Sequence, residues 1–173
     1  MYAIYVDGSS ENPGLGVSVA IVEDKDTGKV LTQEVKILEE STCNEAEYNA
    51  IKLAINYITN VIPQENVTIY SDSMLAVNQL NGSYKIKNPA LYALNEEIKN
   101  IIKDKQLKCT IKYVPREQNV KADFIAHTTL QALVETKKKT KKNKKKEVKK
   151  HGKRKPRLAR NTSHKSRSKR NSH

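Results

Sequence analysis

Four carboxylate residues in the first 123 positions have the types and surroundings of a metal site. Asp7 and Asp72 each end a strongly apolar stretch, whereas Glu47 and Asp123 each lie early in an apolar pattern typical of a helix. A carboxylate at the edge of a hydrophobic core is unfavourable unless a positive charge meets it. If the four converge, they form an oxygen-ligand site for divalent ions, which suits hydrolysis of a phosphodiester.

Glu47 is the most informative of these acids. Thr42 is expected to cap a helix over residues 42–59, and Glu45 completes a capping box. Glu47 has no such structural role. It shares a helical face with the apolar residues Ile51, Ala54, Ile55 and Ile58. The alternative is a glutamate at the edge of the buried face whose carboxylate reaches water.

The other three acids also have ordinary structural alternatives. Asp123 lies in the first turn of a predicted helix, where the helix dipole favours an acid. Asp7 and Asp72 follow strands, where aspartate commonly forms turns. Taken together, the four favour a functional interpretation, because neighbouring carboxylates without cations would repel one another strongly. Two Mg²⁺ ions would relieve that repulsion, and the absence of His and Cys ligands fits Mg²⁺.

The order of predicted elements indicates an α/β fold. The predicted strands and helices, in chain order, cover residues 2–7, 16–23, 30–38, 42–59 (helix), 67–71, 73–80 (helix), 89–105 (helix), 109–114 and 120–135 (helix). Three strands followed by βα units predict a mixed sheet with helices on its faces. Pro115 favours an edge position for the last strand. In open α/β sheets, ligands gather where Asp7 and Asp72 are expected, at the carboxyl ends of strands.

Charge predicts one globular domain, residues 1–135, followed by a basic tail, residues 136–173. The tail holds 19 of the 32 Lys and Arg with one acid, a net charge of +18, whereas the domain holds 13 bases and 18 acids, a net charge of −5. With almost no apolar residues, the basic tail is expected to be disordered and to favour a polyanion. A solubilising or localisation role stays open, because Lys153-Arg154-Lys155-Pro156-Arg157 also matches a nuclear address.

Nothing in the sequence indicates export or a membrane. No signal peptide follows Met1, and no run approaches the roughly 20 apolar residues that span a bilayer. Cys43 and Cys109 are expected to be reduced thiols in the core rather than a disulfide. We therefore expect an intracellular protein, cytoplasmic by default with a nuclear location open, and a monomer.

Residues 1–134 resemble a type 1 ribonuclease H domain. The resemblance rests on four motifs in order: Asp7-Gly8-Ser9 with Asn12-Pro13-Gly14, Thr42-Cys43-Asn44-Glu45-Ala46-Glu47-Tyr48, Ser71-Asp72-Ser73, and Val114-Pro115-Arg116-Glu117-Gln118-Asn119 ahead of Ala122-Asp123. It implies a five-stranded mixed sheet flanked by helices, and endonucleolytic cleavage of the RNA strand of an RNA–DNA hybrid with two Mg²⁺ or Mn²⁺ ions. By position, it assigns catalysis and metal binding to Asp7, Glu47, Asp72 and Asp123.

The resemblance also implies how the substrate is held. Asn12 and Asn44 match positions that contact RNA 2′-hydroxyls, and Thr42 matches a position that binds a phosphate of the DNA strand. Many bacterial relatives carry a His in the loop before the last acid. Here that loop carries Arg116 instead, which resembles the shorter archaeal and plant-like branch of the family. Our hypothesis places its guanidinium near the scissile phosphate. That branch lacks a basic protruding helix, and we expect the basic tail to supply part of its affinity for nucleic acid.

Two other functions stay open from the sequence alone. One is a non-catalytic nucleic-acid-binding protein on the same fold, and the other is an adaptor whose tail contacts ribosomal RNA. The complete set of four acids argues against the first, because a binding module has no need to hold them together.

Overall fold

The computed structural model describes the backbone of residues 1–151 and the side chains of residues 1–144. The chain divides into a compact unit, Met1–Thr136, and a second unit that begins at Lys137. The sheet and all four candidate acids belong to the first unit. The rest of the predicted tail, residues 152–173 with its basic cluster, lies outside the described residues.

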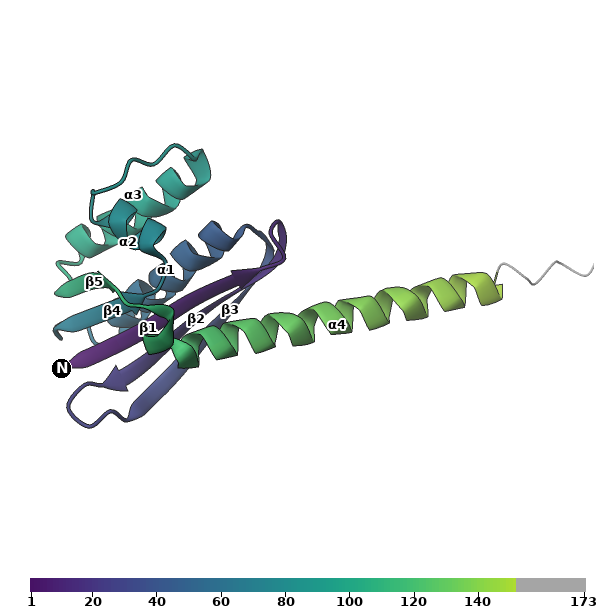
Figure 1. Ribbon diagram of the computed structural model, residues 1–173, viewed down its shortest axis with the longest axis horizontal. Helices are drawn as coiled ribbons and strands as arrows, with labels where there is room; N and C mark the ends of the chain where they lie inside the picture. Colours follow the sequence, from purple (N-terminus) through teal and green to yellow (C-terminus); the bar gives the residue numbers. More distant parts are fainter. Residues whose placement is uncertain (152–173) are drawn as a thin grey trace, which may run out of the picture. The chain divides into compact units, whose positions relative to one another are not determined.

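One mixed sheet forms the centre of the first unit (Figure 1). The strands and helices are β1 (Tyr2–Ser10), β2 (Gly14–Asp24), β3 (Val30–Ser41), α1 (Cys43–Val61), β4 (Val67–Ser71), α2 (Met74–Leu80), α3 (Pro89–Asp104), β5 (Cys109–Tyr113), a 3₁₀ turn (Arg116–Gln118) and α4 (Val120–His151). The strand order is β3-β2-β1-β4-β5, antiparallel from β3 to β1 and parallel from β1 to β5. This confirms the predicted five-stranded mixed sheet, with β5 at an edge.

Several elements extend beyond their predicted ends, and β1 and α4 are the two that matter most for the site and the tail. β1 continues past Asp7, because its antiparallel pairing with β2 persists as far as Ser10 opposite Gly16. Helix α4 continues beyond its predicted end at Glu135 and reaches His151. Lysine is a good helix former, and no Gly or Pro interrupts this stretch.

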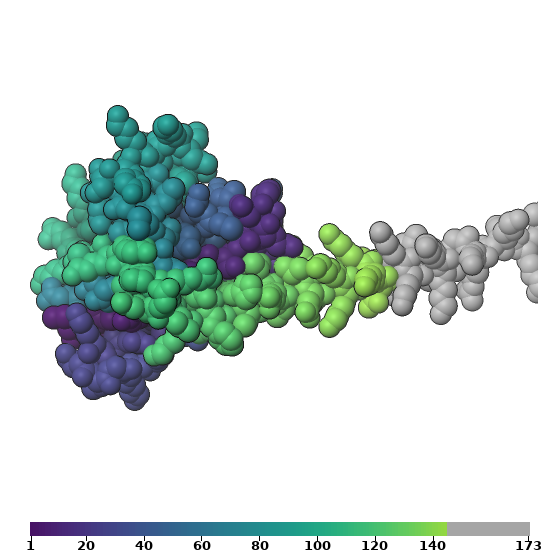
Figure 2. All heavy atoms as spheres, viewed as in Figure 1, coloured from purple at the N-terminus to yellow at the C-terminus, as the bar shows by residue number. Residues whose placement is uncertain are grey.

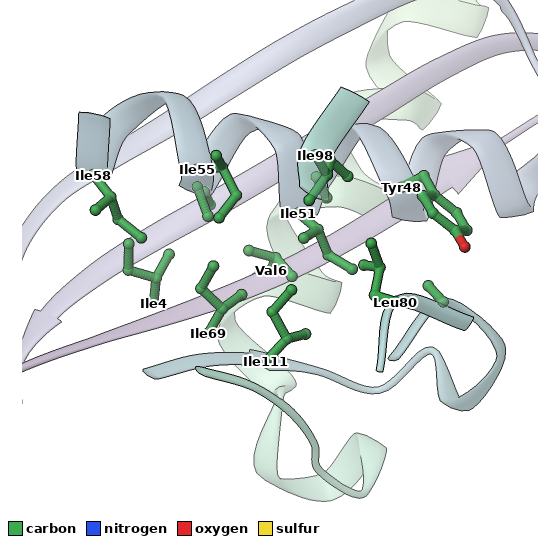
Figure 3. Packing of buried hydrophobic residues seen from close by; sticks show 14 of the residues in the cluster. Ile4, Val6, Tyr48, Ile51, Ile55, Ile58, Ile69, Leu80, Ile98 and Ile111 are labelled. Carbon is green, nitrogen blue, oxygen red and sulfur yellow. The ribbon is translucent and has the colours of Figure 1, made fainter. Parts of the chain in front are cut away.

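Helices α1, α2 and α3 cover one face of the sheet and build the larger core (Figure 3). The apolar face predicted for α1 is buried there, because Ile51, Ile55 and Ile58 are fully inaccessible. Each such side chain contributes about 1.5–3 kcal/mol relative to an exposed one. They pack against residues of β1, β4, β5, α2 and α3, among them Ile4, Val6, Ile69, Leu80, Ile98 and Ile111.

The first turns of α4 cover the opposite face and make a smaller core. Ala122, Ala126 and Leu130 pack with the apolar residues of β2, namely Leu15, Val17, Val19 and Ile21. The hairpin that joins β2 to β3 forms the lower edge of the domain face seen in Figure 2 (dark blue-purple). The sheet is thus held between two helical layers, which fixes where its strands end.

Two further expectations can be compared with residues 1–151. No helix in that range is both long and apolar enough to cross a membrane. Cys43 and Cys109 are free thiols, as predicted, but Cys43 is exposed at the start of α1, so its expected place in the core is wrong. Burial of Cys109 raises the pKa of its thiol, so this side chain belongs to the packing rather than to a reactive site.

Candidate active site

Strands β1 and β4 bring two acids to the same part of the sheet. Their parallel pairing aligns Val6 with Ser71, so Asp7 and Asp72 follow at neighbouring positions. The Asp7 side chain is only 5% exposed, and Asp72 is half-buried. The convergence predicted for the two strand-end acids therefore follows from the register of this pair.

Helix α1 brings Glu47 to the same place. The predicted capping box is present: Thr42 accepts a hydrogen bond from the Glu45 N–H, and the Glu45 carboxylate accepts one from the Thr42 N–H. With its start fixed there, α1 crosses β1 so closely that a Cβ on Gly8 would lie 2.2 Å from the Glu47 nitrogen. The Gly8 N–H donates a hydrogen bond to the Glu47 carboxylate. Only glycine at position 8 permits this close approach of α1 to β1.

Oxygen atoms of Asp7, Glu47 and Asp72 lie within 4.8 Å of one another. Within the described part of the chain, the Oε2 atom of Glu47 is buried and has no hydrogen-bond partner. A buried carboxylate oxygen without a donor is costly. Three carboxylates at this spacing, one of which carries an unpartnered buried oxygen, fit a hard divalent cation such as Mg²⁺ or Mn²⁺.

The electrostatics of the three acids agree with this fit. Burial, followed by repulsion from Asp72 and Asp123 and partly offset by Arg116, raises the pKa of Asp7 to about 7. Burial, followed by the charges of Asp7 and Asp72, also raises the pKa of Glu47 well above its usual range. Proteins place acids in such a cluster at a cost in stability, and a bound cation offsets that cost.

Burial and repulsion, which together raise the Asp7 pKa, predict how the stability of the metal-free protein depends on pH. The Asp7 pKa is about 7 in the folded state against an ordinary value of 3.8, so the folded state binds this proton more tightly than the unfolded chain does. Its stabilising contribution is complete below the lower value and is lost as pH rises through the higher one. In EDTA, we expect the free energy of unfolding to fall between about pH 4 and pH 8 relative to Asp7→Asn. Urea unfolding at a series of pH values checks this, and a difference between the two proteins that is constant with pH would contradict it.

Asp123 lies close to the group but is not part of it. Its charge raises the Asp7 pKa, yet its carboxylate pairs with the guanidinium of Arg116. Arg116 comes from the 3₁₀ turn, is largely exposed, and has a pKa raised by this contact. Of the four predicted ligands, the structure therefore brings three together, with the fourth beside them and neutralised by arginine.

Three of the four predicted substrate contacts, all except Arg116, gather at the start of α1. Asn12 accepts a hydrogen bond from the Cys43 N–H at 3.3 Å, which holds the β1–β2 loop against the helix. Asn44 is exposed in the first turn, and Thr42 caps that turn. Thr42 and Asn44 therefore lie about one helical turn from Glu47, and Asn12 contacts the same end of α1.

Two residues at the site were not predicted from the sequence. Gly8 lies in β1, beyond the predicted strand over residues 2–7, and permits the contact with α1. Asn119 was named only within a motif, whereas its side chain is buried against Asp72. The signal for Asn119 was its place one helical turn before Asp123, at the entry to α4.

Comparison with known proteins gives consistent matches. A family model described as reverse transcriptase-like matches residues 5–129. The chain is similar to the bifunctional protein Rv2228c of Mycobacterium tuberculosis, with 27% identity over 129 residues. This alignment covers 75% of the chain but 35% of that protein, so the chain spans about a third of the relative's length.

Two solved structures are matched by this chain over nearly their whole length. The N-terminal RNase H domain of Rv2228c, solved as a fusion with maltose-binding protein, has a TM-score of 0.70 at 28% identity, covering 78% of this chain and 96% of that one. LC11-RNase H1, isolated from compost by a metagenomic approach, was solved in complex with an RNA/DNA hybrid. That structure has a TM-score of 0.67 at 28% identity and covers 74% of this chain and 95% of that one. The chain therefore belongs to the reverse transcriptase-like family, and its fold is that of a type 1 ribonuclease H domain.

Proposed function

We propose that the protein is an endonuclease that hydrolyses the RNA strand of RNA–DNA hybrids with two Mg²⁺ or Mn²⁺ ions. The observation that carries this proposal is the mutual approach of the Asp7, Glu47 and Asp72 oxygens within 4.8 Å. The hybrid bound to the similar LC11-RNase H1 supports the choice of substrate. A non-catalytic binding protein would have no use for a cluster that raises its own electrostatic energy.

The residues of the chain have distinct roles in this proposal. Asp7, Glu47 and Asp72 hold the ions, and Asp123 completes the ligand set from the edge of the cluster. Divalent ions bound there would activate water and stabilise the leaving 3′ oxygen, giving 3′-hydroxyl and 5′-phosphate products. Asn12 and Asn44 would contact 2′-hydroxyls of the RNA strand, and Thr42 a phosphate of the DNA strand.

A cleavage assay tests the proposed function. A hybrid labelled on the RNA strand is incubated with the full chain in Mg²⁺, in Mn²⁺ and in EDTA, with the matching single-stranded RNA as control. We expect cleavage of the hybrid in either metal, none in EDTA, and little of the single strand. Tight hybrid binding with no cleavage in either metal would instead support the non-catalytic alternative.

Arg116 gives a separate prediction about the phosphate. In this proposal its guanidinium exchanges from Asp123 to an oxygen of the scissile phosphate when the hybrid binds. We expect Arg116→Ala to lower kcat about tenfold, and Arg116→Lys to restore only part of it because lysine lacks the bidentate fork. Steady-state kinetics on the hybrid measure both variants. An Arg116→Ala enzyme with an unchanged kcat would remove Arg116 from the mechanism.

The basic segment that follows residue 135 gives a prediction about affinity. Within its described part, the Lys residues 137–139, 141, 142 and 144 are exposed on helix α4. Each phosphate that such a charge neutralises releases counterions, so affinity depends on salt but not on base sequence. We expect a chain ending at Glu135 to bind the hybrid more weakly, with a slope of log K against log salt that is shallower by several units. Equal affinity and equal slope for the two chains would mean that the tail serves another purpose.

A further inference from the structure

Asn119 makes two side-chain hydrogen bonds that reach the metal-ligand group. It lies between the 3₁₀ turn and α4, and only 1% of its surface is exposed. Its Nδ2 donates to the Val6 carbonyl oxygen at 2.8 Å and to Asp72 Oδ1 at 2.9 Å. Because both partners can only accept, the orientation of the amide is fixed by its surroundings.

The backbone of Asn119 extends the same connection. Its N–H donates to the Arg116 carbonyl at 2.9 Å, which closes the 3₁₀ turn, and its own carbonyl accepts the Asp123 N–H at 3.1 Å. Val6 directly precedes Asp7 in β1. One residue therefore contacts the backbone next to Asp7, the carboxylate of Asp72 and the backbone of Asp123.

Asp72 needs such a restraint. Asp7 is fixed within a strand, and Glu47 receives a hydrogen bond from the Gly8 N–H, but Asp72 lies beyond the end of β4 and is half-buried. Repulsion from two neighbouring acids would favour a rotamer in which Asp72 turns toward water. The Asn119 amide donates a hydrogen bond that holds one Asp72 oxygen at the site.

We infer that Asn119 is a positioning residue, which holds Asp72 in the orientation required of a metal ligand and ties β1, β4 and the start of α4 together at the site. This inference rests on the proposed function. Asn119 acts through Asp72 rather than by touching metal or substrate. Hydrogen-bond partners of metal ligands typically change metal affinity or activity about 10–100-fold when they are lost.

Mn²⁺ binding without substrate tests the inference separately from catalysis. Isothermal titration with Mn²⁺ is carried out on the wild type, Asn119→Ala and Asn119→Asp. The matched control is Asn95→Ala: Asn95 is also 1% exposed and also has a buried Oδ1 without a partner, but its amide donates to Tyr48 rather than to an acid. Thermal unfolding of each protein measures how much stability each change removes.

We expect both Asn119 variants to bind Mn²⁺ about tenfold more weakly than the wild type, and Asn95→Ala to stay within about twofold. With the hybrid, kcat should fall for the Asn119 variants while KM stays nearly constant, since the substrate surface is intact. Equal losses of Mn²⁺ affinity in Asn119→Ala and Asn95→Ala would overturn the inference, because Asn119 would then support only the fold. Loss of cooperative folding in both Asn119 variants would overturn it for the same reason.

The same experiments separate the inference from the proposed function. A wild type that binds Mn²⁺ but never cleaves the hybrid refutes the nuclease, while the Asn119 titrations still decide the positioning role. A wild type that binds no Mn²⁺ refutes both.

Discussion

Replacing Asp72 with Asn is expected to abolish cleavage while making the metal-free protein more stable. The loss of one charged ligand should lower kcat by at least about 10²–10³-fold, the usual cost of removing a preorganised charge-stabilising group. Asparagine keeps an oxygen that can accept from Asn119, so the local packing is retained. Without the Asp72 charge, repulsion within the cluster falls, because that charge raises the pKa of both Asp7 and Glu47.

Two measurements on the Asp72→Asn protein check this: hybrid cleavage in Mg²⁺, and thermal unfolding in EDTA at pH 8. Asp104→Asn is the matched control, since Asp104 is an exposed acid at the end of α3 and should affect neither quantity. Cleavage by Asp72→Asn at the wild-type rate would show that this acid is not a ligand. If Asp72→Asn were less stable than the wild type in EDTA, the Asp72 carboxylate would stabilise the metal-free protein instead of destabilising it.

Gly8→Ala is expected to be strongly destabilising and to impair catalysis. Its Cβ would lie 2.2 Å from both the Ala46 carbonyl carbon and the Glu47 nitrogen, so α1 must move away from β1. Shifts of this kind in a packed core cost roughly 2–4 kcal/mol. Because Glu47 moves with the helix, we also expect Mg²⁺-dependent cleavage to fall in whatever fraction remains folded.

Gly28→Ala separates the steric contact from the general effect of replacing glycine. Gly28 has a φ of +68° and no atom within 4 Å of its Cβ position, so alanine there costs only about 1 kcal/mol of backbone strain. Urea unfolding of both variants gives the comparison. If the two changes cost the same, the contact between β1 and α1 does not limit the choice of residue at position 8.

Local sequence signals predicted most of the fold. The capping box at Thr42 and Glu45, the apolar face of α1 and the strand over residues 67–71 are all as expected, because each depends on neighbours within a few positions. The length of β1 was missed because it depends on pairing with β2, which local apolar patterning does not report. The end of α4 was predicted at residue 135 because the apolar pattern stops there, whereas the helix propensity of lysine lets the helix continue to His151.

The candidate site was predicted as a set of residues but not as a geometry. Residue type and apolar context selected Asp7, Glu47 and Asp72, and the structure places their oxygens together. The pairing of Asp123 with Arg116 depends on how the 3₁₀ turn meets α4, and a motif does not contain this information. The bonds of Asn119 join residues 113 positions and 47 positions apart, so only the fold shows them.

The place of β1 in the sheet has a consequence for how the site arises as the chain is made. β1 lies between β2, the next strand in the chain, and β4, which follows only after α1. During synthesis from the N-terminus, β1 therefore has an open edge until β4 has been made, and Asp7 has no strand beside it there. No contiguous piece that ends before β4 contains the acidic cluster, so the site is a product of the completed topology and not of any single segment.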